Sequence, residues 1–122
     1  MQEFLKYNAI EKRKDYYLVS CLIEVLVDDS VITSWYEEYC DATNSVPEGS
    51  RIIIDFSRTK ILSSIAFQRF IEIYYSLKNR KIAFGFSGMN DTIVGVMKMT
   101  CLDRIFVLGN NIVDVFDKLA NR

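Results

Sequence analysis

The sequence predicts one α/β domain, spanning residues 1–122, that is built on a mostly parallel sheet. Two short and nearly continuous apolar runs, Arg51–Phe56 and Ile82–Phe86, are typical of strands covered on both faces. Between them, residues 65–77 follow the helical period. Strands separated by helices need right-handed crossovers, which make neighbouring strands parallel. A chain of 122 residues is large enough for a single hydrophobic core.

The chain is expected to begin with two strands joined by a turn. Phe4–Ile10 predicts the first strand, Lys12–Asp15 the turn, and Tyr16–Val27 the second strand. Apolar side chains occupy both faces of Tyr16–Val27, which places this strand inside the sheet. Because the connection is short, the first strand is antiparallel to the second.

A helix ending near Thr43 is expected next, with Asp28, Asp29 and Ser30 as candidate N-cap residues. Apolar residues then recur at helical spacing: Val31, Trp35, Tyr39 and Ala42. The segment Asn44–Gly49 contains the only proline of the chain and separates this helix from the strand Arg51–Phe56.

The central strand leads, through the polar connector Ser57–Lys60 and the apolar pair Ile61–Leu62, to a second helix. Ser63 suits the N-cap of this helix, where its hydroxyl oxygen can accept from free backbone N–H groups. Ser64 then lies in the first turn, at the positive end of the helix dipole. The buried stripe is expected at Ala66, Phe70, Tyr74 and Leu77.

The last third of the chain predicts two further strand–helix units. After the strand Ile82–Phe86, Asn90 is a candidate N-cap for a helix over Asp91–Thr100. A last strand is expected at Arg104–Leu108. The final helix has apolar residues at i, i+3, i+4 and i+7, namely Ile112, Val115, Phe116 and Leu119. The complete predicted order is ββαβαβαβα, with an antiparallel first strand.

Composition excludes several classes of function. The net charge is −1 and the basic run Lys12–Lys14 falls in the expected hairpin turn, so no nucleic-acid partner is expected. The apolar stretch Tyr16–Val27 is too short and too interrupted for membrane insertion, and the N-terminus does not resemble a signal peptide. We therefore expect a cytoplasmic protein.

The cysteines and the lack of histidine argue against a metal or cofactor site. Cys21, Cys40 and Cys101 have wide, patternless spacing and are interpreted as reduced core thiols. Without histidine, the commonest metal ligand and the usual general base are missing. Asp55 ends a buried strand, but no catalytic constellation stands near it in the sequence. No cofactor, no metal and no enzymatic activity are therefore expected.

The segment from Asp55 to Ser64 resembles the STAS family, the domain of anti-sigma factor antagonists and sulfate-transporter tails. In that family a buried strand ends in Asp or Asn, and after a short turn two apolar residues precede Asp-Ser-Ser/Thr-Gly-Leu at a helix start. Here the apolar pair is Ile61–Leu62, the family's Asp falls on Ser63, and its phosphorylated serine falls on Ser64. The segment Asn90–Phe106 resembles the family's second signature, a helix that ends in a turn with glycine, here Cys101.

The resemblance implies a non-enzymatic regulator with a phosphorylation switch at Ser64. A phosphate would add about −1.5 to −2 charges at a helix N-terminus that tolerates an anion. In such antagonists the unmodified form binds a kinase-type anti-sigma factor and the phosphorylated form releases it. The alternative is that Ser63 and Ser64 are simply capping residues.

Partner contacts are expected from the second helix start and its neighbouring loops. The candidate residues are Asp28, Asp29, Arg58, Ser63, Ile65, Phe67 and Asn90. The pair Asp28–Asp29 lies where the antagonists often carry a partner-binding acidic residue, and helix capping is its alternative role. Arg58 and Asn90 follow buried strands, where open α/β sheets bind ligands, and ordinary solvated loops are the alternative.

Departures from the family pattern leave a second function open. Ser63 replaces the family's Asp, and Ile65–Phe67 replaces Ser/Thr-Gly-Leu, which makes the helix start bulkier and more apolar. The chain could therefore be a phosphorylation-independent STAS binding subunit, either in a stressosome-like scaffold or as the partner of a lipid transporter. A small enzyme or ligand-binding domain is a third alternative. An apolar patch among Tyr74–Tyr75, Phe67 and Phe70 could serve a partner or a homodimer.

Overall fold

The computed structural model describes residues 2–121, which form a main sheet of six strands in the order β1-β2-β3-β5-β7-β8. In chain order these strands are β1 (Gln2–Phe4), β2 (Asn8–Lys12), β3 (Tyr17–Cys21), β5 (Arg51–Asp55), β7 (Ala83–Ser87) and β8 (Val107–Gly109). The pairs β1–β2 and β2–β3 are antiparallel, whereas β3–β5, β5–β7 and β7–β8 are parallel. The mostly parallel sheet predicted from the sequence is confirmed.

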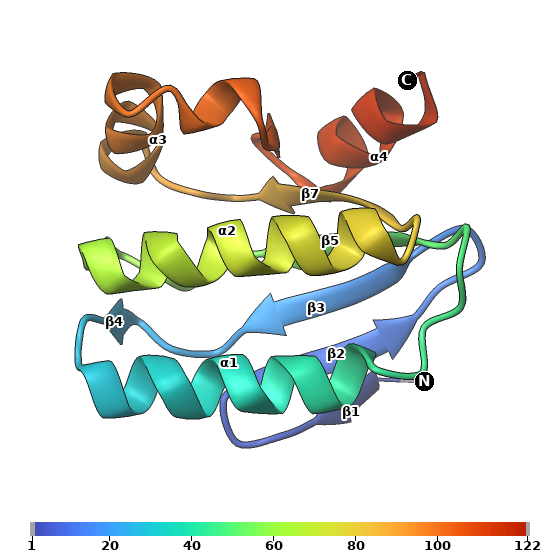
Figure 1. Cartoon of the computed structure of the whole chain (residues 1–122), viewed down its shortest axis with the longest axis horizontal. Helices are drawn as coiled ribbons and strands as arrows, with labels where there is room; N and C mark the ends of the chain where they lie inside the picture. The colour runs from blue at the N-terminus through green and yellow to red at the C-terminus, as the bar shows by residue number, and fades with distance from the viewer. Residues whose placement is uncertain (1, 122) are drawn as a thin grey trace.

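Helices cover both faces of this sheet (Figure 1). They are α1 (Asp29–Thr43), α2 (Ser64–Asn79), α3 (Asp91–Met99) and α4 (Ile112–Ala120), with a short 3-10 helix, η1 (Leu102–Arg104). Ile52 and Ile54 of β5 pack in the cluster that contains the buried residues of α1 and α2, whereas Ile53 packs with Val115 and Leu119 of α4. Since alternate residues of a strand point to opposite faces, α1 and α2 cover one face and α4 the other. The order ββαβαβαβα is confirmed for β2, β3, β5, β7 and β8 with their helices.

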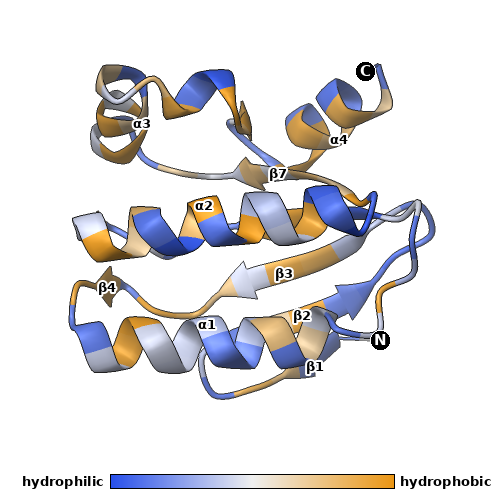
Figure 2. Ribbon diagram, in the orientation of Figure 1, coloured by the Kyte–Doolittle hydropathy of each residue, from blue (hydrophilic) through white to orange (hydrophobic). Residues whose placement is uncertain are grey.

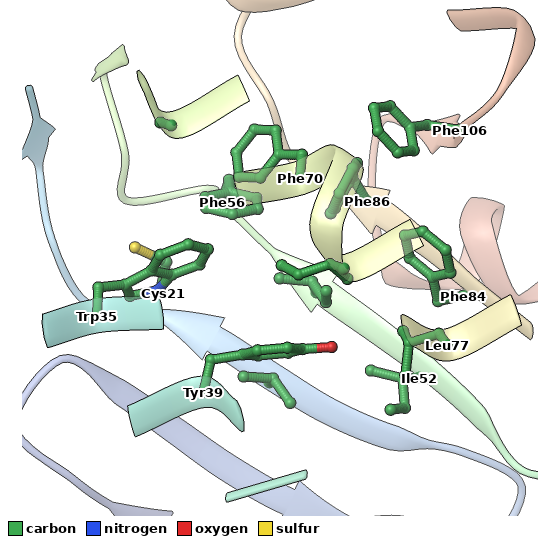
Figure 3. Packing of buried hydrophobic residues seen from close by; sticks show 14 of the residues in the cluster. Cys21, Trp35, Tyr39, Ile52, Phe56, Phe70, Leu77, Phe84, Phe86 and Phe106 are labelled. Carbon is green, nitrogen blue, oxygen red and sulfur yellow. The ribbon is translucent and has the colours of Figure 1, made fainter. Parts of the chain in front are cut away.

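The larger core lies between the sheet and the helices α1 and α2. Its centre is a group of fully buried aromatic rings in which Phe70 of α2 lies 5.2 Å from Phe56 and 5.0 Å from Phe86, between ring centroids. The ring of Trp35, from α1, lies 5.9 Å from the ring of Phe56 and belongs to the same group (Figure 3). Such aromatic pairs contribute about 0.5–1.5 kcal/mol each beyond the area that they bury.

The smaller core depends on two glycines that let α4 approach the sheet closely. A Cβ atom at Gly85 would lie 2.6 Å from Val115, and one at Gly109 would lie 2.7 Å from it. Real Cβ atoms do not approach other carbon atoms so closely, so these positions suit only glycine in this packing.

The first two predicted strands are each divided in the structure. The prediction of one strand over Phe4–Ile10 is wrong, because the chain turns at residues 5–7 and forms the hairpin β1–β2. The carboxylate of Glu38 in α1 accepts from the turn amides of Lys6, Tyr7 and Asn8, at 3.1, 2.9 and 2.8 Å. This long-range contact holds the turn, and nothing in the local sequence pattern indicates it.

The predicted strand Tyr16–Val27 is divided as well, into β3 and β4 (Val25–Leu26). β4 leaves the main sheet and pairs in parallel with β6 (Ile61–Leu62), so that Val25 lies beside Ile61 and Leu26 beside Leu62. The apolar alternation continues through residues 22–27, but Val25 and Val27 are exposed instead of buried. The alternation therefore predicted a longer buried strand than the structure contains.

Smaller differences concern boundaries and helix faces. The last strand begins at Val107 instead of Arg104, because η1 occupies residues 102–104. The helix faces are predicted in part. Trp35 and Tyr39 on α1, and Ala66, Phe70 and Leu77 on α2, are buried as expected. Ile32 and Thr43 are buried in place of Val31 and Ala42, and Ile73 in place of Tyr74. Figure 2 shows hydrophilic residues interleaved with hydrophobic ones along both helices, as expected for helices with one buried face.

Two further expectations about side-chain exposure need correction. Of the three cysteines, only Cys21 is a core thiol, whereas Cys40 is half-buried and Cys101 is exposed. Phe70 is completely buried and cannot belong to a surface patch. Tyr75 is 60% exposed on the outer side of α2, while Tyr74 and Phe67 are half-buried against the core.

Candidate functional site

The small sheet β4–β6 places the starts of α1 and α2 side by side. Asp28 and Ser63, the N-cap residues of the two helices, each follow one of its strands by one or two residues. The amide of Ser63 donates to the carbonyl oxygen of Leu26 at 3.2 Å, and the amide of Lys60 donates to the carbonyl oxygen of Glu24 at 2.8 Å. In Figure 1 both helices begin at the end of the molecule where β4 lies. The structure thus brings together residues that are separated by 35 positions in the sequence.

Ser64 is the first residue of α2 and its side chain is exposed. The preceding residue, Ser63, has the extended backbone of an N-cap, with φ −93° and ψ 169°. The position predicted for the N-cap is therefore correct, but the predicted capping hydrogen bond is not made. The Ser63 hydroxyl is buried and has no hydrogen-bond partner among residues 2–121. The amide groups of the first turn near Ser64 consequently lack a side-chain cap.

Asp28 caps α1 with its side chain. Its carboxylate accepts from the amide of Ser30 at 2.9 Å, from the amide of Val31 at 3.3 Å, and from the Ser30 hydroxyl. The hydroxyl bond, followed by the two amide bonds, lowers the pKa of the Asp28 carboxyl below its ordinary value. Asp29 lies in the first turn and is exposed, so two carboxylates occur at the positive end of α1.

The loop after β7 joins the same surface through Asn90. The Asn90 side-chain oxygen accepts from the amide of Ile93 at 2.9 Å and caps α3, as predicted. Its side-chain nitrogen donates to the carbonyl oxygen of Lys60 at 2.9 Å. This second bond ties the start of α3 to the connector that precedes β6.

A buried threonine anchors the connector between β5 and β6. The Thr59 hydroxyl donates to the carbonyl oxygen of Ile23 at 2.7 Å, and Thr59 is almost fully buried. Lys60 forms an exposed ion pair with Glu24, 3.1 Å between Nζ and Oε1. Arg58 lies on the exposed part of the connector, where a partner could contact it.

Asp55 has a structural role at the end of β5. Its carboxylate accepts from the Ser87 hydroxyl at 2.7 Å and from the amide and hydroxyl of Ser57. A Cβ atom at Gly88 would lie 2.9 Å from an Asp55 oxygen, so the loop after β7 closes over this carboxylate. The hydrogen bonds of Asp55 fasten together the loops that follow β5 and β7.

The apolar candidates of α2 are less exposed than Ser64. Ile65 and Phe67 are both half-buried and pack against the larger core. The Phe67 ring lies 5.7 Å from that of Phe70, edge to face. Only the outer parts of these two side chains can contact a partner.

An exposed apolar patch beside Ser64 was missed in the sequence. It consists of Val25, Val27 and Ile61, which are 47%, 42% and 52% exposed. Val25 and Ile61 are neighbours in the β4–β6 sheet. Three aliphatic side chains exposed together beside two helix starts are a feature of protein-binding surfaces. The sequence signal was misleading, because Val25 and Val27 fit the alternation of a buried strand.

The described part of the chain contains neither a metal-ligand cluster nor a membrane-spanning helix. Within residues 2–121, no three His, Cys, Asp or Glu side chains come together in a way that could hold a metal ion. No helix in this range is long and apolar enough to cross a membrane.

Comparisons with known proteins identify the fold. No protein-family model matches the sequence, and no curated protein matches it. Among solved structures, a serine-to-glutamate variant of RsbS from Moorella thermoacetica has a TM-score of 0.71 at 24% identity, covering 92% of this chain and 93% of that one. An anti-sigma factor antagonist from Mycobacterium paratuberculosis has a TM-score of 0.77 at 18% identity, covering 93% and 92%. A protein of the stressosome, a signal integration and transduction hub, has a TM-score of 0.64 at 22% identity, covering 92% and 96%.

These similarities extend over nearly the whole length of both chains in each comparison. The chain therefore has the fold of the anti-sigma factor antagonists, the STAS fold. The fold predicted from the resemblance of the Asp55–Ser64 segment is confirmed.

Proposed function

We propose that this protein is a non-enzymatic regulator that binds a protein partner at the shared start of α1 and α2. The partner surface consists of the exposed hydroxyl of Ser64, the carboxylates of Asp28 and Asp29, and the patch formed by Val25, Val27 and Ile61. The observation that carries the proposal is the position of Ser64, exposed at a helix start and beside that apolar patch. Similar folds in proteins described as anti-sigma factor antagonists and as a stressosome component support it.

Phosphorylation of Ser64 is the proposed switch. The first-turn amides beside it lack a side-chain cap, so a phosphate could accept hydrogen bonds from them without disturbing α2. The same phosphate would place a strongly hydrated charge next to Val25 and Ile61 and close to the carboxylates of α1. Burying this charge against a partner would be unfavourable, and repulsion from Asp28 and Asp29 would add to the effect. The modified protein therefore folds normally and releases its partner.

The proposed partner is a serine kinase of the anti-sigma factor type, which would both bind this surface and modify it. A kinase must reach the hydroxyl that it phosphorylates. Ser64 is exposed, whereas the hydroxyls of Ser63 and Ser87 are buried. The protein would act in the cytoplasm, where such a kinase and its ATP are found.

Incubation with the cognate kinase and ATP, followed by intact mass and peptide mass spectrometry, tests the switch. We expect one phosphate on Ser64 in the wild type and none in Ser64→Ala. In a binding assay with the purified kinase, Ser64→Glu should weaken the complex about tenfold or more, equivalent to about 1.4 kcal/mol. Ser76→Glu is the matched control, because Ser76 is an exposed serine of the same helix, three residues before its end. Phosphate on another residue, or equal effects of the two glutamate variants, would contradict the switch.

A constitutive binding subunit, which acts without phosphorylation, is the second candidate function. The observation that favours it is the helix start itself, where Ser63 supplies neither the carboxylate of the family pattern nor a capping hydrogen bond. The similarity to a stressosome component agrees with a role in a scaffold. The alternative is that the protein is a binding subunit of a transporter. In this case Ser64→Glu leaves partner binding unchanged, whereas Val25→Asp or Ile61→Asp abolishes it.

A further inference from the structure

A small cavity lies between the carboxyl-terminal halves of α1 and α2, and its volume is about 140 Å³. Its lining includes Tyr39 and Thr43 from α1, with Ile73 and Leu77 from α2. Ser64 begins α2 and Leu77 lies in its last turn, so roughly 20 Å of helix separates the cavity from the proposed partner surface. Because a cavity of about 150 Å³ can bind benzene, this one has room for a ligand of a single ring.

The Tyr39 hydroxyl is a buried polar group without a hydrogen-bond partner. Tyr39 is only 3% exposed, and no group among residues 2–121 forms a hydrogen bond with its hydroxyl. Burial raises the pKa of this hydroxyl, so it stays a neutral donor at physiological pH. Figure 3 shows the hydroxyl directed from α1 toward Leu77 of α2, which lines the same cavity. Since an unpaired buried donor is unfavourable, it favours a bound molecule at this position.

The Thr43 hydroxyl supplies an acceptor to the same cavity. Thr43 follows Tyr39 by one helical turn, so both residues lie on one face of α1. The Thr43 hydroxyl donates to the carbonyl oxygen of Tyr39 at 2.8 Å, and its own oxygen can still accept. A free donor together with a free acceptor is complementary to a hydroxyl group, which both accepts and donates.

Arg80 is the one charged residue that lines the cavity within the described part of the chain. Its Nη2 atom donates to the carbonyl oxygens of Thr43, Asn44 and Val46, at 2.9, 3.2 and 2.8 Å. These carbonyl groups lie at the negative end of α1, so they compensate much of the guanidinium charge. The same bonds join the end of α2 to the end of α1, the two elements between which the cavity lies. The lining therefore favours an uncharged ligand.

We infer that this cavity binds a small uncharged alcohol or phenol. The ligand hydroxyl accepts from Tyr39 and donates to Thr43, and the apolar body packs against Ile73 and Leu77, which are both 1% exposed. A charged ligand would lose its hydration here without a free charge to compensate it, because Arg80 already binds backbone carbonyl groups. Binding at this cavity is a further property of the protein and does not depend on the proposed partner.

Phenol, toluene and benzoate are matched probes, because they share one ring and carry a hydroxyl, a methyl or a carboxylate group. Each is titrated into the whole protein and followed by amide and methyl NMR. We expect phenol to shift the resonances of residues 36–43 and 73–80. Phenol should bind about fivefold more tightly than toluene, as expected for one additional hydrogen bond, and benzoate should bind more weakly than toluene.

Tyr39→Phe removes the hydroxyl and keeps the ring. We expect this variant to bind phenol about fivefold more weakly and toluene with unchanged affinity. Because the hydroxyl has no partner in the free protein, its removal should leave the fold intact. Tyr75→Phe is the matched control, since Tyr75 is 60% exposed on the same helix as Leu77 and lies outside the cavity.

Three results would overturn the inference. The first is the lack of localised shifts up to about 10 mM phenol, which would show that the cavity holds only water. The second is an equal affinity of Tyr39→Phe and Tyr75→Phe for phenol. The third is tighter binding of benzoate than of phenol, which would indicate an anion site. None of these results bears on partner binding at Ser64, which lies at the other end of α2.

Discussion

The Ser87 hydroxyl at the end of β7 donates a hydrogen bond of 2.7 Å to the Asp55 carboxylate at the end of β5. Ser87 is fully buried, while Asp55 is half-buried and holds the Ser57 loop with its other oxygen. The bond thus links two adjacent strands to the loops that follow them.

Removing this hydroxyl should destabilise the protein. We expect Ser87→Ala to lower the free energy of unfolding by about 1–2 kcal/mol, because a hydrogen bond to a charged group is lost within a buried site. Urea unfolding followed by circular dichroism measures the change. Ser57→Ala is the control, since Ser57 is exposed and water can replace its hydroxyl. A Ser87→Ala variant as stable as the wild type would show that the bond contributes nothing.

Two glycines should respond to alanine in opposite directions. In Gly85→Ala the new Cβ would lie 2.6 Å from Val115, and we expect a loss of about 1–3 kcal/mol from overpacking between β7 and α4. In Gly95→Ala the new Cβ meets no atom within 4 Å, and α3 should gain about 0.5–1 kcal/mol of helix stability. Thermal unfolding of the two variants checks both signs. Similar shifts in both would contradict the close packing of α4.

Cys101 has a left-handed backbone, with φ 60° and ψ 17°, just after α3. Residues with a Cβ atom pay about 1–2 kcal/mol for this conformation, whereas glycine adopts it freely. Because glycine is also more flexible in the unfolded chain, we expect Cys101→Gly to stabilise the protein by only about 0.5–1 kcal/mol. Cys101→Ala should leave the stability nearly unchanged, which separates the backbone effect from the loss of the thiol. A destabilised glycine variant would contradict the assigned conformation.

The contribution of Asp28 to stability should depend on pH. Its pKa is lowered in the folded protein, so the stabilisation is present above its unfolded value of about 3.8 and is lost as the pH falls through the folded pKa. We expect Asp28→Ala to lower Tm at neutral pH, and the gap to the wild type to narrow when the pH falls below about 3.8. Asp29→Ala is the control, because the hydrogen bonds that cap α1 come from Asp28. A gap that stays constant from neutral to acid pH would show that the charge of Asp28 does not matter.

The elements with one consistent local pattern could be predicted from the sequence. The run Arg51–Phe56 gave β5, because three consecutive isoleucines suit a strand buried on both faces. The spacing of Ile112, Val115, Phe116 and Leu119 gave α4. Asn90 was identified as an N-cap, and the N-cap Asp28 was one of three adjacent candidates, since capping depends on residues only two or three positions apart.

The features that were missed depend on contacts between distant residues. The turn at residues 5–7 is held by Glu38, about 30 positions away, and no local pattern indicates it. The exposure of Val25 results from its pairing with Ile61 outside the main sheet, which periodicity alone cannot distinguish from burial. The sequence indicates the type of residue at the N-cap of α2, but not that the Ser63 hydroxyl makes no capping hydrogen bond.

The hydrogen bond from the Ser63 amide to the Leu26 carbonyl oxygen connects the segment that precedes α2 with the segment that precedes α1. β4 and β6 pair with each other outside the main sheet, so the strands that lead into α1 and α2 are in direct contact. Residues that share such a contact usually show coupled energies, so the effects of substitutions at Asp28 and Ser64 would not simply add.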